Sequence, residues 1–493
     1  MAAKNYVVAI ELGSTKITGI AGQRKSDGTI TDIKVVREDA SQCIRKGVVY
    51  NIDKTAQCIQ SIISRLNAQL RARVRSAYVG VGGQSIHSEI NTVVEDLESN
   101  TIVTQEKVAS IDDKNHSMEY ADMQILDVAV QGYRADSIPQ KDPAGVCCSR
   151  LEGNFLNVLQ AKRHIKNVNL CFEKAGVEIQ EIVPAPLALA DAVITPDEKR
   201  SGCVLVDLGA STTTVVVYSK DVLRQVAVIP LGCNNITKDI CELQVDEVEA
   251  EQIKLKYASA YTPVEEVDSN AKYAISGERT VSAPQLIEIV EARVNEIITN
   301  VWNFVPEEYK DNQLRGGVIL TGGGSNMKGI ELAFRKYTKV EKVRVAKFCN
   351  VNVVAANNSD IKKDGTMNTF LGILAKGVLN CCMPVEEPKS QDIFAQEAHS
   401  TGETVRVASP ASQPESVAQP GVAPQPGVYA QPQSAGSTPV QTVQPQPQPQ
   451  PQQPQAPEPV IEEPEVKEEP AKPKKKGFGA KIFEWLLSTT EAD

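Results

Sequence analysis

Two short stretches of the sequence combine an acidic residue, a glycine and hydroxyl-bearing residues in the same order. Both Glu11-Leu-Gly-Ser-Thr-Lys16 and Asp207-Leu-Gly-Ala-Ser-Thr212 follow a run of apolar residues. A carboxylate, a glycine that lets backbone N–H groups approach a ligand, and nearby hydroxyls are the groups that a metal-bound phosphate requires. Either stretch alone is better explained as an ordinary turn, because Asp, Gly, Ser and Thr are common turn residues. Two copies in one chain favour a phosphate site.

Each stretch lies between two runs that are rich in β-branched residues. Residues 7–10 and 17–21 flank the first stretch, and residues 203–206 and 212–218 flank the second. Such runs on both sides of a glycine-containing turn predict a β-hairpin. We therefore expect two hairpins, roughly one domain length apart, each with its acidic residue in the turn.

Two further stretches have spacings that suit a ligand. In a predicted helix at residues 245–257, Glu251 and Lys254 are three residues apart and share one helix face. A solvated ion pair is the alternative reading of these two residues. After a predicted strand at residues 317–320, the three glycines at 322–324 would let a flat ring lie against bare backbone, or would simply end the strand.

The composition limits the class of protein. The 493 residues, 41% of them hydrophobic, are enough for two to four domains with large cores. A net charge of -10 argues against a nucleic-acid-binding protein, which needs a broad basic surface. The 11 cysteines include no Cys-x-x-Cys pair and the four histidines lack metal-ligand spacing, so we expect reduced thiols and no metal site built on them. The first residues show no apolar signal core and no apolar run suits a bilayer, which predicts a body that stays in the compartment where it is made.

The segment between the two hairpins predicts an insertion. Residues 84–164 combine strand patterns with a polar helix candidate at residues 104–118, which is typical of a compact α+β interaction module. An apolar helix at residues 186–193 then leads toward the second hairpin. Another apolar helix, at residues 366–379, closes the folded part, and its glycines predict close packing.

The composition changes sharply beyond residue 384. Residues 385–473 are rich in Pro, Gln, Ser, Ala and Glu and are expected to form a disordered tether with a reach of about 50 Å. Residues 474–493 begin with lysines and continue as a short aromatic amphipathic helix, which suits an anionic membrane surface. Docking into a groove on a partner or on the protein's own body is the alternative. The residues expected at the membrane are Lys474, Lys475, Lys476, Phe478, Lys481, Ile482, Phe483, Trp485 and Leu486.

In their order and spacing, these motifs resemble the nucleotide site of the actin, Hsp70 and sugar-kinase superfamily. Within that superfamily the chain resembles the FtsA family of bacterial cell-division proteins. The resemblance rests on Ala9-Ile-Glu-Leu-Gly-Ser-Thr-Lys16, on Val318-Ile-Leu-Thr-Gly-Gly-Gly324, on the position of the inserted segment, and on the tether with its terminal amphipathic helix. It covers most of residues 1–383.

The resemblance implies an α/β, actin-like (ribonuclease H-like) fold of two halves with ATP and Mg²⁺ in the cleft. It also implies an inserted α+β subdomain, a disordered tail and a terminal amphipathic helix. The expected boundaries are 1–83, 165–200 and 358–383 for subdomain 1A, 84–164 for the inserted subdomain 1C, 201–231 and 316–357 for subdomain 2A, 232–315 for subdomain 2B, 384–473 for the linker and 474–493 for the membrane-targeting helix.

The same resemblance implies a role for each motif residue. Phosphate would be bound by Gly13, Ser14, Thr15 and Lys16 from one half and by Gly209, Ala210, Ser211 and Thr212 from the other. Asp207, together with Glu11, would hold Mg²⁺ through water. Glu251 and Lys254 would border the ribose and adenine, and the adenine would be lined by Gly322, Gly323 and Gly324.

One position limits the enzymatic expectation. Actin-like ATPases usually place Gln or Glu at the start of the helix that follows the strand ending near residue 183, where this residue orients the attacking water. The corresponding residue here is Ala185, which cannot polarise water. Glu11 also stands where many relatives have Asp, although FtsA-like sequences share this Glu. We therefore expect ATP binding with slow or absent hydrolysis, and no catalytic residue is assigned.

The family's role implies a protein that polymerises on the cytoplasmic face of the inner membrane at the division septum, anchors FtsZ filaments there and recruits later division proteins. The C-terminal peptide of FtsZ is expected at residues 232–315, with Arg293 meeting its acidic groups, although a surface arginine is usually only solvated. The alternatives are another actin-superfamily protein, such as a pilus-assembly or rod-shape homologue, and a small-molecule kinase. A kinase would need a base facing a substrate pocket and would have no use for a membrane tether.

Overall fold

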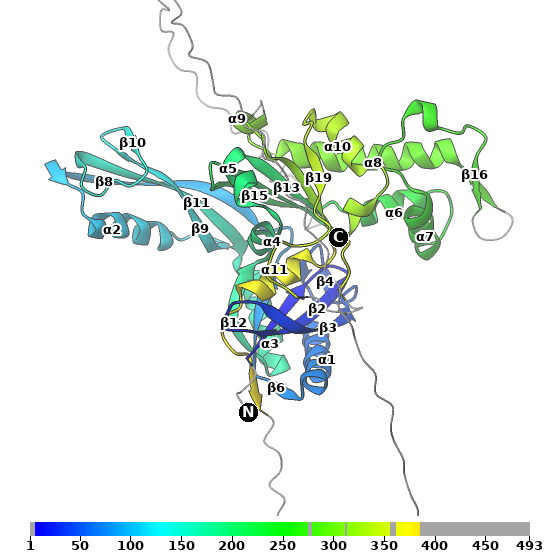
Figure 1. Cartoon of the computed structure of the whole chain (residues 1–493), viewed down its shortest axis with the longest axis horizontal. Coiled ribbons are helices and arrows are strands. Elements are labelled where there is room, and N and C mark those ends of the chain that lie inside the picture. Colours follow the sequence, from blue (N-terminus) through cyan, green and yellow to red (C-terminus); the bar gives the residue numbers. More distant parts are fainter. Residues whose placement is uncertain (1–4, 275–278, 311–312, 355–360, 385–493) are drawn as a thin grey trace, which may run out of the picture. The chain divides into compact units, whose positions relative to one another are not determined.

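The computed structural model describes residues 5–274, 279–310, 313–354 and 361–384, all of which belong to one compact unit (Figure 1). The expected tether and the membrane residues from Lys474 to Leu486 lie outside the described residues. In the part of the chain that the structure describes, no helix is long and apolar enough to span a bilayer.

The first hairpin belongs to a sheet of five described strands in the order β3-β2-β1-β7-β12. Strand β2 is antiparallel to both β1 and β3, whereas β7 and β12 run parallel to β1. Strand β1 is buried on both faces, which is why it reads as a continuous apolar run. The strands are β1 (Tyr6–Leu12), β2 (Lys16–Arg24), β3 (Ile30–Asp39), β7 (Ser76–Val81) and β12 (Glu178–Pro184).

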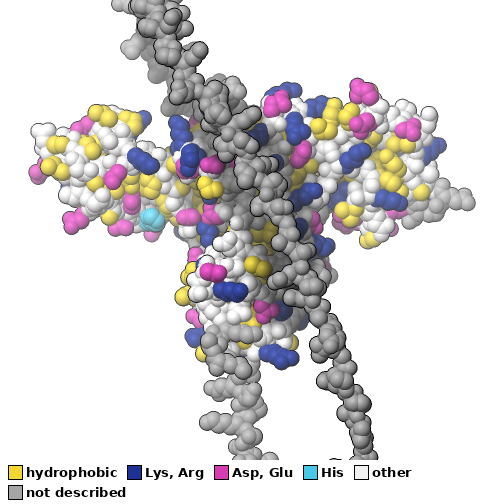
Figure 2. Space-filling view, in the orientation of Figure 1, with side chains coloured by type: hydrophobic (Ala, Val, Ile, Leu, Met, Phe, Trp, Pro, Cys, Tyr) yellow, Lys and Arg dark blue, Asp and Glu magenta, His cyan; other side chains and the backbone are white. Residues whose placement is uncertain are grey.

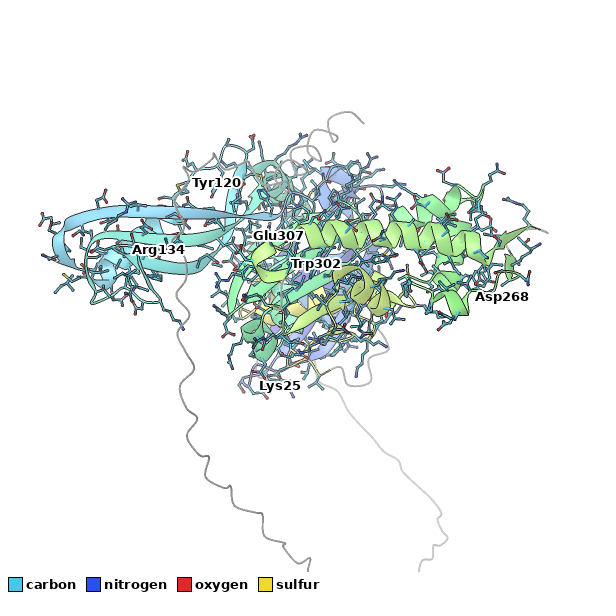
Figure 3. All side chains as sticks on the ribbon, turned by 90° about the horizontal axis from the view of Figure 1, so that it is seen from above. Lys25, Tyr120, Arg134, Asp268, Trp302 and Glu307 are labelled. Carbon is cyan, nitrogen blue, oxygen red and sulfur yellow. The ribbon has the colours of Figure 1, made fainter. Side chains whose placement is uncertain are left out.

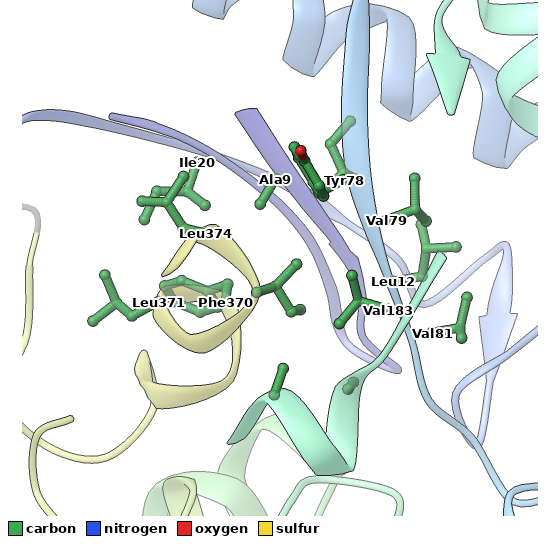
Figure 4. Close-up of a cluster of buried hydrophobic side chains, with 14 of the residues drawn as sticks. Ala9, Leu12, Ile20, Tyr78, Val79, Val81, Val183, Phe370, Leu371 and Leu374 are labelled. Atoms are coloured by element: carbon green, nitrogen blue, oxygen red, sulfur yellow. The ribbon is translucent and has the colours of Figure 1, made fainter. Parts of the chain in front are cut away.

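Helices cover both faces of this sheet. Along β2, a side chain at Gly19 would meet Ile62 of α1, and one at Gly22 would meet Leu374 of α11. Figure 4 shows the face against α11, where Phe370, Leu371 and Leu374 pack near Ala9 and Ile20. The helices are α1 (Ile52–Leu70) with α3 (Lys162–Ala175) on one side and α11 (Asn368–Lys376) with α4 (Ala185–Val193) on the other.

The second hairpin belongs to a larger sheet that repeats the strand order of the first. Strands β15-β14-β13-β18-β19 correspond to β3-β2-β1-β7-β12, with the same parallel and antiparallel neighbours. The strands are β13 (Cys203–Leu208), β14 (Thr213–Ser219), β15 (Val222–Ile229), β18 (Gly317–Thr321) and β19 (Val343–Val345). The described part of the chain therefore contains one architecture twice, which places the two hairpins at equivalent positions.

Helices that precede, separate and follow its strands in the sequence cover the second sheet. The side chains of Val204 and Val206 contribute to a core with α8, whereas Cys203 and Leu205 pack into the core of the first half. This alternation is the expected consequence of a strand that is buried on both faces. The helices and short turns are α5 (Pro196–Ser201), α6 (Cys233–Cys241), α7 (Glu247–Tyr257), η1 (Val264–Glu266), α8 (Ala283–Asn303), α9 (Glu307–Lys310), η2 (Gly323–Asn326) and α10 (Ile330–Thr338).

The inserted α+β subdomain is confirmed. It leaves the first sheet after β7 and returns at α3, and its own small core is formed between one helix and three long strands (Figure 3). A pair between Ala227 of β15 and His87 joins it to the second sheet. Its elements are β8 (His87–Ile102), α2 (Gln105–His116), β9 (Met123–Ala135), β10 (Ile138–Gln140) and β11 (Cys147–Ala161).

Short two-stranded ladders complete the described structure. The ladders pair β4 (Ile44–Arg45) with β5 (Val48–Val49), β6 (Ala72–Val74) with β20 (Cys382–Pro384), and β16 (Lys272–Ala274) with β17 (Thr280–Ser282). The predicted close packing at residues 366–379 is confirmed, because a side chain at Gly372 of α11 would collide with the carbonyl oxygen of Ala188 in α4. On the face shown in Figure 2, basic and acidic side chains are interspersed.

Candidate functional site

The two hairpins hold their acidic residues in the same way. Glu11 lies opposite Thr18 in the β1–β2 pair, and Asp207 lies opposite Thr214 in the β13–β14 pair. Both acids are therefore strand residues next to the turn, and the expectation that they lie within the turn is wrong by two residues. Strands β1 and β13 extend two residues further than expected, because their pairing with the next strand continues to Leu12 and to Leu208.

The turn glycines are also equivalent. A Cβ at Gly13 would lie 2.7 Å from the carbonyl oxygen of Lys16, and a Cβ at Gly209 would lie 2.7 Å from that of Thr212. Contacts this short do not occur at real Cβ atoms, so each turn needs glycine to close. Both turns thereby present backbone without a side chain toward the same space.

That space is a cavity of about 370 Å³ that both hairpins line. The sequence-predicted residues that the structure brings to it are Glu11, Gly13, Ser14, Thr15, Lys16, Asp207, Gly209, Ala210 and Thr212. Ser211 instead lines an adjacent cavity of about 690 Å³, which it shares with Ser14 and Thr15. The structure thus brings together residues that are almost two hundred positions apart in the chain.

Ionisation of the two carboxyl groups is unfavourable in the absence of a bound cation. Burial and the negative charge of Asp207 raise the pKa of Glu11 to about 7, and burial raises the pKa of Asp207 to about 6. Among the described residues, neither carboxylate forms an ion pair. Two acids that lack a cationic partner and face one cavity fit a hydrated divalent cation, because Mg²⁺ typically keeps several waters and uses one or two carboxylates.

The structure contains few other candidates for metal ligands. Within the described ranges, no three His, Cys, Asp or Glu side chains gather in a way that could hold a metal ion. A cation between Glu11 and Asp207 would therefore take its remaining ligands from water and from a bound phosphate.

A smaller cavity of about 80 Å³ lies against the same two acids. Ala185 and Pro186, at the start of α4, line it together with Glu11 and Asp207. Ala185 thus faces the same cavity as the two acids and contributes only a methyl group to it. By liquid volume this cavity accommodates about two or three waters.

A third cavity, of about 440 Å³, lies beside the second hairpin and is large enough for a small ligand. Glu251, Lys254, Gly323 and Gly324 line it, and their contact with ribose and adenine stays a prediction. Gly322 does not line it. Gly322 instead lines the cavity of about 370 Å³ that contains Glu11 and Asp207, called the acidic cavity from here on. A Cβ at Gly322 would collide with Oδ1 of Asp207.

Glu251 and Lys254 form an ion pair that also lines this cavity, and the pair is not simply solvated because Lys254 is buried. The Lys254 Nζ atom lies 2.6 Å from Oε2 of Glu251 and donates to Oγ1 of Thr237 at 2.8 Å. It also donates to the Cys233 carbonyl oxygen at 3.2 Å. Because Lys254 is buried and fully engaged, it fixes the Glu251 carboxylate, whose side chain remains 41% exposed and available to a ligand hydroxyl.

Several lining residues were not predicted from the sequence. Arg37 of β3 and Lys362 reach the acidic cavity from parts of the chain that carry no motif. Cys233 and Asn234, at the start of α6, line the third cavity. Gly232, where a Cβ would collide with the backbone of the Ala210 turn, was the one local signal that could have placed α6 beside the second hairpin.

Arg293 lies in the middle of α8 and lines none of these cavities itself. Its Nε and Nη2 atoms donate to the two carboxylate oxygens of Asp239 at 2.6 and 2.8 Å, and it also pairs with Glu296. Asp239 belongs to α6, so Arg293 holds α6 against α8. Its contact with a partner peptide stays a prediction.

A duplicated five-strand arrangement with one acidic hairpin in each copy, both facing a shared cavity, defines an actin-like protein. Residues 204–367 match the family model described as cell division protein FtsA, and residues 83–159 match the SHS2 domain inserted in FTSA. The chain belongs to the FtsA family of cell division proteins.

Individual relatives agree with this assignment. The chain is 30% identical to cell division protein FtsA of Porphyromonas gingivalis over 68% of its own length and 72% of that protein. It is 30% identical to the Pseudomonas aeruginosa FtsA, covering 66% of this chain and 80% of that protein. A solved PilM-PilN type IV pilus biogenesis complex matches with a TM-score of 0.50 and 12% identity, over 75% of this chain and 97% of that chain, which reflects the fold alone.

Proposed function

We propose that this chain binds ATP with Mg²⁺ in the cavity between its two hairpins. The observation that carries this proposal is that Glu11 and Asp207, from equivalent positions in two separate sheets, face one cavity of about 370 Å³. Their raised pKa values fit a site that is completed by a cation. Mg²⁺ neutralises phosphate charge when it is bound.

Each element of the site would serve a different part of the nucleotide. Backbone N–H groups of the turns at 13–16 and 209–212 would bind phosphate oxygens. Glu251, oriented by Lys254, would accept hydrogen bonds from ribose hydroxyls. The bare backbone of Gly323 and Gly324 would lie against the adenine ring.

ATP hydrolysis would be slow or absent. A general base or a water-orienting side chain is needed to position the attacking water, and Ala185 supplies neither. A single-turnover assay with excess protein measures this directly. Rapid release of phosphate would overturn this part of the proposal.

Equilibrium binding of a fluorescent ATP analogue, with and without Mg²⁺, tests the nucleotide site. Asp207→Asn should weaken Mg²⁺-dependent binding by at least about tenfold, because it removes one of two charges next to the cation. Asp197→Asn, at an exposed position of α5, is the matched control. Equal affinities for both variants and the unaltered chain would count against the site.

In the cell, the protein would polymerise on the cytoplasmic face of the inner membrane at the septum, anchor FtsZ filaments and recruit later division proteins. Membership of the FtsA family and the basic amphipathic sequence at residues 474–493 support this role. Electron microscopy of the purified chain on an anionic lipid monolayer with ATP tests polymer formation and attachment together. Dispersed particles under these conditions would contradict it.

The small-molecule kinase is the less well supported alternative. The chain belongs to the FtsA family of cell division proteins, and Ala185, at the start of α4 beside the two acids, supplies no base for an acceptor substrate. A pilus-assembly role would rest on a likeness that extends to the fold alone.

A further inference from the structure

The last described residues of the chain cross one end of the first sheet. Strands β1, β7 and β12 begin at this end, and β2 finishes there. The backbone N–H groups of Val378 and Leu379 both donate to the Tyr78 hydroxyl at 3.1 Å. Arg24 donates to the Gly377 carbonyl oxygen at 2.6 Å. The chain therefore leaves the described body from a fixed position, beside the β6–β20 ladder (Figure 1).

Three large apolar side chains on this crossing segment face solvent. Val378 is 58% exposed, Leu379 52% and Met383 48%, although all lie within six positions of one another. Cys381 and Cys382, between them, are buried, so the segment is packed on the body while its outer side chains remain uncovered. Exposed apolar residues are ordinary when scattered, but a cluster marks a surface that contacts something apolar.

Arginines flank this cluster. Arg73 lies directly opposite Met383 in the β6–β20 ladder, and both side chains point outward because Ala72, Val74 and Cys382 are buried. Arg71, which caps α1 with a left-handed backbone, is also exposed. We call Arg71, Arg73, Val378, Leu379 and Met383 the exit surface.

Among the described residues, the acids near the exit surface are paired with other basic residues. At this end of the sheet, Asp32 pairs with Lys34 and Glu178 pairs with Arg75. Asp27 lies in the turn beside Lys25, so these two charges offset each other. No described residue forms an ion pair with Arg71 or Arg73. Within the described part of the chain, the exit surface is therefore an apolar strip with two unpaired arginines beside it.

We propose that the exit surface rests on an anionic lipid surface, so that the body of the protein contacts the membrane where the chain departs toward its tail. This inference rests on the proposed membrane role of residues 474–493. A strip of apolar residues beside arginines matches an anionic bilayer, which takes apolar side chains between its headgroups and attracts basic ones.

A contact at the exit surface would orient the body relative to the membrane, which the tether alone would not do. A tether with the expected reach of about 50 Å would hold the body near the membrane but would leave its orientation free. A second, weaker contact at the exit surface becomes intramolecular once the terminal helix has bound, so it needs little affinity of its own. It would turn one side of the nucleotide-binding body consistently toward the lipid.

Vesicle flotation of the full chain tests this contact, with phosphatidylcholine vesicles prepared with or without phosphatidylserine. Each basic residue near an anionic surface strengthens binding about fivefold, so Arg71→Glu/Arg73→Glu should lower the partition coefficient at least about tenfold on phosphatidylserine vesicles. The milder Arg71→Gln/Arg73→Gln should lower it less. Both variants alter exposed side chains, and a thermal melt checks that each remains folded.

The matched control is Arg163→Glu/Lys166→Glu, which makes the same charge change in the first turn of α3. Both residues are exposed, and along α3 they lie roughly 14 to 18 Å from the helix end that leads to β12 at the exit side. This control should bind within about twofold of the unaltered chain. Equal losses in both double variants would show that net charge alone matters and would overturn the proposal.

Hydrogen exchange of the full chain provides a second readout. Amides at residues 71–75 and 378–384 should exchange more slowly on phosphatidylserine vesicles than in solution. Suppose that the full chain floats, that these amides exchange as fast on vesicles as in solution, and that Arg71→Glu/Arg73→Glu binds as well as the α3 control variant. The lipid contact of the exit surface is then refuted while the membrane role stands.

If the full chain does not float, the membrane role itself fails and the exit surface with it. If deleting residues 474–493 speeds exchange at 378–384 in lipid-free protein, the terminal helix covers this surface instead, which would also refute the lipid contact.

Discussion

At the scale of single residues, Glu11 links proton binding, cation binding and stability. Its folded pKa of about 7 lies above the ordinary glutamate value of 4.5, because burial and the charge of Asp207 disfavour the ionised form. A raised carboxyl pKa means that the folded state binds the proton more tightly than the unfolded state does. The cation-free protein therefore loses stability as the pH rises from about 4.5 to about 7.

Replacing Glu11 by Gln should relieve this loss. Without nucleotide or Mg²⁺, Glu11→Gln should raise the free energy of unfolding at pH 8, by on the order of 2 kcal/mol after allowance for solvent in the cavity, and change it little near pH 4.5. Urea denaturation at the two pH values measures the difference. Glu181→Gln, which alters an exposed acid of β12, is the control. It should change the free energy of unfolding by the same amount at both pH values. Equal effects of Glu11→Gln at the two pH values would contradict the raised pKa.

The affinity for Mg²⁺ should depend on pH in the opposite direction. Both carboxyl groups must be ionised to hold the cation, and their pKa values are about 7 and about 6. Between pH 6 and pH 8, Mg²⁺-dependent nucleotide binding should therefore strengthen by roughly tenfold or more. Calorimetric titration at the two pH values checks this. A flat profile for the unaltered chain would show that the acids do not hold the ion.

At the scale of elements, the turn after β18 controls where Asp207 points. Gly322 has a φ of 82°, and a Cβ there would collide with Oδ1 of Asp207. Gly322→Ala should therefore lower the free energy of unfolding by on the order of 2 to 3 kcal/mol and abolish Mg²⁺-dependent binding. Gly323→Ala is a neighbouring control, because its Cβ would meet only Thr366 at 3.9 Å and the fold should be unaffected. Equal melting temperatures for the two variants would refute this account.

The pair between α6 and α8 changes how the FtsZ contact should be tested. Arg293→Glu removes a bidentate bond to Asp239 and places a third acid there, so it should cost about 2 to 3 kcal/mol of stability as well as any peptide binding. Asp239→Asn weakens the same bond but keeps the arginine charge. If Arg293 meets the acidic FtsZ tail peptide, fluorescence anisotropy should show lost binding for Arg293→Glu and preserved binding for Asp239→Asn. Loss of peptide binding in both variants would show that the broken contact between α6 and α8, and not the arginine charge, causes the loss.

The sequence was informative where the residues of one feature are neighbours in the chain. Glu11, Gly13 and the flanking β-branched runs are contiguous, so one hairpin can be recognised without knowing the rest of the fold. Arg37 and Lys362 reach the same cavity from β3 and from the segment before α11, and neither position carries a pattern. Only the packing of α11 against β1 and β2 brings them together. The position of Gly322 beside Asp207 depends on the β13–β18 pairing, which no local pattern predicts.

At the scale of the whole molecule, the folded body and the C-terminal tail are expected to act independently. The described residues form three apolar cores, and residues 385–473 are rich in Pro, Gln and Ser, a composition that buries little apolar surface. A chain that ends at residue 473 should therefore keep the melting temperature of the full chain. Saturating Mg²⁺ and ATP should stabilise both chains equally, by about 2.7 kcal/mol at a hundredfold excess over Kd.

Truncation should instead remove binding to vesicles. Without the terminal helix, the weak contact of the body is no longer held at a high local concentration near the lipid. A truncated chain that melts earlier or binds ATP less tightly would mean that the terminal residues contribute to the body, and the tail could then no longer be treated as a separate anchor.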